Sequence, residues 1–168
     1  MSENTPAPNI QTSVILWAAM LMSCLIYVVI AFVLEKPEGF ELEKEQFNLF
    51  LMVFGAMAPG MAIPAFLARG FLIKQNLSNK SEPVTESDVV AAYHTGSIVG
   101  WAFTESISIF GFVIFMLSYE RWVLAPFVGL SVLLFLLTFP RKSQIADYMK
   151  EYGSSASSTP DQPTGSSW

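Results

Sequence analysis

The chain has few charged residues and only one cysteine and one histidine. Charged residues make up 14% of its 168 residues, about half the share of an ordinary soluble domain. The single cysteine, Cys24, excludes an intrachain disulfide, and with one histidine we expect no zinc site of the usual kind. Lys and Arg number 9 against 14 Asp and Glu, so there is no basic footprint for nucleic acid. We therefore expect neither a metal nor a nucleic-acid partner.

The sequence also lacks the common catalytic motifs. It contains no glycine-rich phosphate loop and no G-x-S-x-G nucleophile elbow. Its sole imidazole, His94, has no persuasive nucleophile or carboxylate with which to form a triad. We expect a protein that is not an enzyme and holds no cofactor.

Hydrophobic residues, by contrast, make up 52% of the chain, and mean hydropathy is +0.47. They gather in four blocks, at residues 14–34, 47–73, 89–117 and 122–139. A bilayer core of about 30 Å is spanned by about 20 helical residues. The first and fourth blocks carry no charge and show no polar face, unlike a helix of a soluble bundle. The pattern predicts an all-α polytopic membrane protein, a four-transmembrane-helix bundle at residues 13–140 in a lipid bilayer.

The remaining segments are short and polar. We expect a polar N-terminal tail at residues 1–12, a juxtamembrane segment at 141–152 and a disordered tail at 153–168. Before the third block, Thr85 and Asp88 have the spacing of a helix capping box. Lys and Arg number six on the side of both termini and three on the other side. This bias predicts cytoplasmic N- and C-termini in an inner or plasma membrane.

Glu105 lies near the middle of the third block. A carboxylate inside a membrane is costly and indicates a functional site by default. A group that is neutral in lipid and charged near water is suited to carrying a proton. His94, Ser97, Trp101, Glu105 and Ser108 fall at helical spacings of 3, 4, 4 and 3 and form one polar stripe. His94 is either a proton relay or an anchor at the interface, and Glu105 is either an ion site or a structural hydrogen bond between helices.

Small and helix-bending residues predict close packing between the second and third blocks. The third block has a G-x-x-x-G spacing, which allows another helix to approach. Two prolines predict a kink in the second block, and the carbonyls that they free are candidate acceptors for a hydrogen bond from Glu105. The predicted packing residues are Gly96, Gly100, Gly55, Gly60, Pro59 and Pro64.

The stretch AFTESISIFGFVI, residues 102–114, resembles the ion-carrying helix of the rotor-ring c subunit of F-type ATP synthases. The matching positions are Ala102, Glu105, Ile109, Gly111 and Val113. The resemblance implies that Glu105 is the ion-carrying carboxylate, with Ser106 at the hydroxyl position of sodium-using members. It covers 13 residues; the family's alternating glycines and its Arg-Gln-Pro loop are missing, and two further helices flank the hairpin. The chain would be a divergent, c-like four-helix membrane protein.

These observations predict an ion-transport subunit that binds or carries a proton at Glu105, with Ser106 and Ser108 tuning the site. A proton is favoured over sodium because the second block has no Gln or Glu inside the membrane. Such a subunit would work as a homo-oligomer or with other membrane subunits. The alternative is a non-catalytic four-helix scaffold or accessory subunit. A small-molecule exporter ranks third, because four-helix exporters carry their carboxylate in the first helix, and the first block has none.

Overall fold

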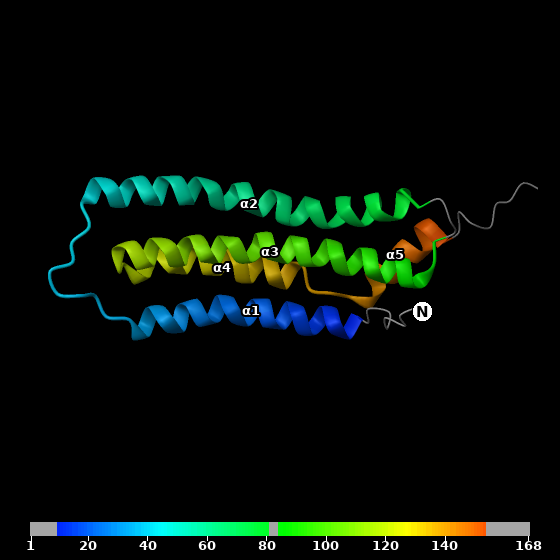
Figure 1. Cartoon of the computed structure of the whole chain (residues 1–168), viewed down its shortest axis with the longest axis horizontal. Coiled ribbons are helices and arrows are strands. Elements are labelled where there is room, and N and C mark those ends of the chain that lie inside the picture. The colour runs from blue at the N-terminus through cyan, green and yellow to red at the C-terminus, as the bar shows by residue number, and fades with distance from the viewer. Residues whose placement is uncertain (1–9, 81–83, 154–168) are drawn as a thin grey trace, which may run out of the picture.

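The computed structural model describes residues 10–80 and 84–153, which form five helices and no strand. The helices are α1 (Ile10–Val33), α2 (Lys44–Ser78), α3 (Glu86–Ser118), α4 (Arg121–Leu137) and α5 (Lys142–Gly153). Helices α1 to α4 run side by side along the long axis, and α5 lies at the end where α2 stops and α3 starts (Figure 1). We call this end the α5 end, and the opposite end, with residues 34–43, the loop end. The predicted all-α class is confirmed.

Three of these helices, α1, α2 and α3, are each long and apolar enough to cross a membrane. Helix α4 has 17 residues and forms with α5 a pair bent by 56°, which raises the number of candidate spans to four. Large apolar side chains lie on the outside: Phe32 is 68% exposed and Leu67 is 66% exposed. An apolar exterior of this extent fits lipid rather than water. The chain is a polytopic helical membrane protein.

Helix α3 is the centre of the structure and contacts each of the other four helices. Helices α1 and α2 lie on opposite sides of it, and α1 also packs against α4 (Figure 1). Trp101 of α3 is fully buried in a cluster with Cys24 of α1 and Phe135 of α4. A second cluster joins α3 and α4 to α2 through Ile107, Phe127 and Ala58. The side chains of α3 therefore determine how the other helices are placed.

Two glycines allow α2 and α3 to approach closely. A Cβ atom on Gly96 would lie 2.9 Å from the carbonyl oxygen of Arg69, and one on Gly100 would lie 2.9 Å from that of Ala65. Ordinary van der Waals contacts of a Cβ begin at 3.4 Å. Only glycine fits at these two positions without a shift of the neighbouring helix.

The predicted packing residues of α2 behave differently from those of α3. Gly55 and Gly60 are exposed, and a Cβ at either position would meet no atom within 4 Å. They lie on the outer face of α2, so the predicted packing against the third block does not take place at these two glycines. Helix α2 continues through Pro59, which is exposed, and Pro64, which is half-buried.

At the α5 end, α2 and α3 continue as helices beyond the apolar blocks and pack against α5. Their shared core includes Ile73, Leu77, Val89 and Tyr93, with Ile145 of α5 against it. Helix α3 begins with the predicted capping box: Asp88 N–H donates to the Thr85 hydroxyl, and the Asp88 carboxylate accepts from Thr85 N–H at 3.0 Å.

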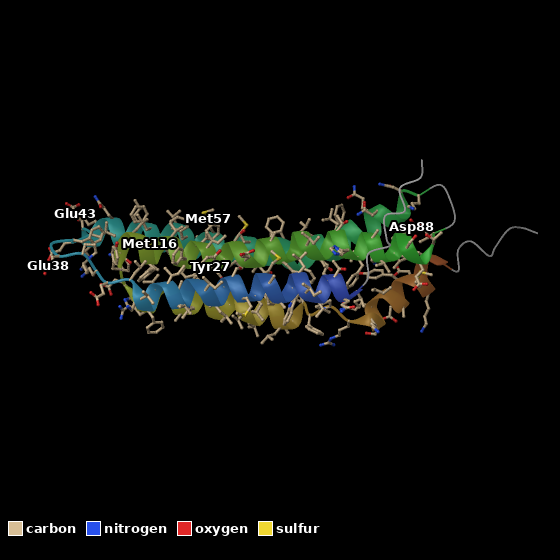
Figure 2. The ribbon with its side chains drawn as sticks, turned by 60° about the horizontal axis from the view of Figure 1, so that its bottom comes forward. Tyr27, Glu38, Glu43, Met57, Asp88 and Met116 are labelled. Atoms are coloured by element: carbon tan, nitrogen blue, oxygen red, sulfur yellow. The ribbon has the colours of Figure 1, made fainter. Side chains whose placement is uncertain are left out.

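Apart from Glu105, the charged residues of the described ranges lie toward the two ends of the bundle. Asp88 is at the α5 end, Glu38 and Glu43 are at the loop end, and Tyr27 lies between the ends (Figure 2). Helix α1 begins at Ile10, inside the segment expected to be a polar tail, because helical hydrogen bonding extends past the apolar block. The rest of that tail, and residues 154–168 of the expected C-terminal tail, lie outside the described residues.

Candidate functional site

The carboxyl group of Glu105 joins α3 to α1. Ser23 Oγ is hydrogen-bonded to Glu105 Oε1, and Tyr27 OH lies 3.5 Å from the same oxygen. Ser23 and Tyr27 are four residues apart, so they share one face of α1. Glu105 itself is half-buried, just past the middle of α3. Two hydroxyl groups from one helix thus meet one carboxyl group from another, between the charged ends of the bundle.

The Ser23 hydroxyl has a second neighbour. Its Oγ lies 2.7 Å from the carbonyl oxygen of Met20, one turn back on α1. A serine hydroxyl carries a single hydrogen, so it can donate to only one of these two oxygens. When Ser23 donates its hydrogen to the Met20 carbonyl, the hydrogen of the bond between Ser23 and Glu105 must come from the Glu105 carboxyl group.

Uncharged side chains complete the surroundings of Glu105. Cys24 and Ser108 are both fully buried beside it. The Tyr27 ring stacks on Phe112 with the ring centroids 5.1 Å apart. In residues 10–80 and 84–153 no cationic side chain pairs with Glu105; the two ion pairs, Lys74–Glu151 and Lys80–Asp88, lie elsewhere.

The residues of the predicted polar stripe separate into different environments. Ser108 Oγ is buried near the site and has no hydrogen-bond partner among the described residues, and the same holds for Ser97. Trp101 Nε1 donates to the Thr138 carbonyl at 3.4 Å, on the α4 side. His94 is half-buried toward the α5 end, far along α3 from Glu105. The stripe therefore does not form one connected chain of hydrogen bonds.

Two expectations for the neighbours of Glu105 are wrong. Ser106 Oγ donates to the Ala102 carbonyl at 2.9 Å, so its hydroxyl is bonded within α3 and not to the carboxyl group. The hydrogen bonds of Glu105 reach α1, not the carbonyls near Pro59 and Pro64 of α2. The reason is that α1 and α2 lie on opposite sides of α3, and Glu105 points to the α1 side.

Sequence reasoning missed Ser23, Cys24 and Tyr27 as neighbours of Glu105. A signal was available, since Ser23 and Tyr27 carry the only hydroxyl groups of residues 14–34. Polar groups in an otherwise apolar membrane helix need partners inside the protein. The sequence does not reveal which helix supplies those partners.

A second polar network surrounds Arg69 at the α5 end. Its guanidinium donates to the Thr138 carbonyl at 3.0 Å, to Gln144 Oε1 at 2.7 Å and to the Tyr93 hydroxyl. The Tyr93 hydroxyl in turn donates to Gln144 Oε1 at 2.8 Å. These bonds tie α2 to α3 and to the segment from α4 to α5. Every acceptor in the network is uncharged.

Neither a metal cluster nor a known family assigns a role to these groups. No group of three or more His, Cys, Asp or Glu side chains that could hold a metal ion occurs in the part of the chain that the structure describes. Comparisons of the chain with protein-family models, with curated proteins and with solved structures gave no match. What the Glu105 site can do follows from its own geometry. One hydrogen can lie between the Glu105 carboxyl oxygen and the Ser23 hydroxyl oxygen.

Proposed function

We propose that this protein is an integral membrane subunit that binds an exchangeable proton at Glu105. The observation that carries the proposal is the position of Ser23 Oγ between two acceptors, the Met20 carbonyl and the Glu105 carboxyl. A proton on Glu105 satisfies both hydrogen bonds, whereas an ionised carboxylate leaves one acceptor without a hydrogen.

The surroundings of Glu105 support the same proposal. A carboxylate within the apolar layer is costly when no cation accompanies it. Among the described residues, only the hydroxyl groups of Ser23 and Tyr27 bond to Glu105, and Cys24 is a further neighbour from α1. Because Glu105 is half-buried, part of this residue is exposed at the surface of the bundle. Exchange of a proton with water or with a partner subunit requires such access.

The assembly and orientation belong to the proposal as well. One carboxyl group in one copy gives no path across a membrane, so we propose a homo-oligomer or a complex with other membrane subunits. Both termini would face the cytoplasm, as the Lys and Arg bias predicts. The c-like resemblance of residues 102–114 is tested by the native mass in mild detergent. A large closed ring of identical copies supports it, and a monomer, a dimer or a mixed complex overturns it.

A second candidate function is a non-catalytic scaffold or accessory subunit. The bridge from Glu105 to Ser23 and Tyr27 favours it, because this bridge fastens α1 to α3. In this case the hydrogen bond matters and proton exchange does not. Glu105→Gln would then preserve both assembly and function, since the amide keeps hydrogen-bonding capacity without a titratable group.

The decisive experiment is labelling by a hydrophobic carbodiimide, which modifies protonated carboxyl groups in apolar surroundings. We expect modification of Glu105 in membranes at low pH and less modification as the pH rises. Glu105→Gln removes the labelled site. Glu43→Gln, a change of the same kind at the exposed loop end, is the matched control and leaves labelling unchanged.

The outcomes separate the two functions. Ser23→Ala removes the oxygen that a protonated Glu105 donates to, so the labelled fraction at a fixed pH should fall while the helix content stays the same. Absence of labelling at every pH rules out an exchangeable proton and leaves the scaffold. Labelling that does not vary with pH also contradicts the proposal.

A further inference from the structure

A cavity of about 440 Å³ lies at the α5 end, among α2, the end of α4, and α5. It is separate from the Glu105 site and shares no residue with it. Its lining combines four charged and two exposed apolar side chains: Arg69, Lys74, Asp147, Glu151, Phe66 and Leu137.

The cavity lies where the outer surface of the bundle changes from apolar to charged. On α2, Phe71 is 65% exposed and is followed one turn later by Lys74. Leu137, the last residue of α4, is 59% exposed, and Arg141 follows four residues later in the segment between α4 and α5. On both segments charged residues thus follow exposed apolar ones beside the cavity. Such a change corresponds to the headgroup region of a bilayer.

The charges inside the cavity are incompletely paired. Arg69 bonds to three uncharged acceptors and, in the described part of the chain, forms no ion pair with a carboxylate. Asp147 likewise forms no ion pair among the described residues, whereas Glu151 lies 3.8 Å from Lys74. Counting the described residues, the cavity therefore has a cation without an anion and a carboxylate without a cation. A ligand with one charge of each sign complements this set.

We propose that this cavity binds the headgroup of an aminophospholipid. Its phosphate pairs with Arg69 and Lys74, and its primary ammonium group donates to Asp147 and Glu151. The acyl chains leave along the exposed side chains of Phe66 and Leu137. Arginine has five N–H hydrogens, and Arg69 donates three of them to protein acceptors, so its Nε hydrogen and one Nη1 hydrogen remain for the phosphate. A purely anionic headgroup would leave Asp147 without a partner, and a quaternary ammonium headgroup has no N–H to donate.

The test measures which lipids stay bound to the full-length protein after release from membranes. The protein is incorporated into bilayer discs with equal amounts of phosphatidylethanolamine, phosphatidylcholine and phosphatidylglycerol, and the retained lipid is quantified by native mass spectrometry. We expect phosphatidylethanolamine to be retained about fivefold over each of the others, the effect of roughly one net hydrogen bond. Retention of phosphatidylcholine or of phosphatidylglycerol at this site equal to that of phosphatidylethanolamine overturns the proposal.

Variants locate the binding. Asp147 and Lys74 line the cavity, and both are exposed rather than part of the buried core. The fold should therefore survive Asp147→Asn and Lys74→Gln. Asp147→Asn should bring the ratio of phosphatidylethanolamine to phosphatidylcholine close to one, because only the ammonium group differs between these lipids. Lys74→Gln should lower the retention of both lipids, because both carry the phosphate. Glu86→Gln is the matched control, since Glu86 is exposed at the same end and does not line the cavity. Loss of selectivity in the control, unchanged selectivity in Asp147→Asn, or unchanged retention in Lys74→Gln contradicts the proposal.

Soluble competitors identify the source of the headgroup chemistry. Inorganic phosphate and free phosphoethanolamine, at the concentration of the lipid, should not displace phosphatidylethanolamine, because they lack acyl chains for Phe66 and Leu137. Displacement by either one would identify a site for a soluble anion or zwitterion and overturn the assignment to a lipid.

Discussion

Replacing Gly100 by alanine should loosen the contact between α2 and α3. The new Cβ would lie 2.9 Å from the carbonyl oxygen of Ala65, against 3.4 Å for the start of ordinary van der Waals contact. The oxygen belongs to the backbone of α2 and cannot rotate away. The helices must therefore separate by several tenths of an ångström, and packing along the shared face is lost with them.

Two opposing contributions set the expected change in the free energy of unfolding. Overpacking a tight interior contact costs about 1–3 kcal/mol. Alanine is favoured over glycine within a helix by about 1 kcal/mol, which offsets part of that cost. We expect a net loss of up to about 2 kcal/mol for Gly100→Ala. Gly60→Ala is the matched control: a Cβ there meets no atom within 4 Å, so the stability should stay the same or rise slightly.

The assay is thermal unfolding in mild detergent, followed by far-ultraviolet circular dichroism, with both variants measured beside the unchanged protein. The expected result is a lower midpoint for Gly100→Ala and an equal or higher midpoint for Gly60→Ala. Equal midpoints for the two variants would refute the reasoning, because they would mean that α2 and α3 do not touch at Gly100.

Three further substitutions test other contacts by the same unfolding measurement. Thr85→Ala removes the side-chain half of the capping box and should cost about 1 kcal/mol; an unchanged midpoint would mean that the start of α3 does not depend on its cap. Arg69→Lys keeps the charge but loses the fork that reaches three acceptors, with an expected loss of about 1–3 kcal/mol, and full stability would contradict the network. Arg121 donates to the carbonyls of Ala31 and Leu34 at the end of α1, so Arg121→Gln should cost under about 1 kcal/mol and speed hydrogen exchange in that last turn; unchanged exchange would argue against this cap.

Local features of the fold could be read from the sequence because each depends on neighbouring residues. Four apolar blocks indicated membrane helices because hydropathy along a block decides whether it prefers lipid to water. The capping box of Thr85 and Asp88 was recognisable because its two partners lie three residues apart. The helix ends were less predictable: α2 extends to Ser78, past the last apolar residues of its block, since its final turns are stabilised by α5.

Hydropathy alone places Glu105 within a membrane helix, and the glycines available for packing can be listed from the residues. The contact of Glu105 with Ser23, 82 residues away in the chain, and the enclosure of Gly100 beside the exposure of Gly60 follow from the packing of the helices. They could not be predicted because a helix that is apolar all round has no polar face to show how it is rotated. Its orientation is fixed by side-chain packing and by the few polar groups that find each other across helices.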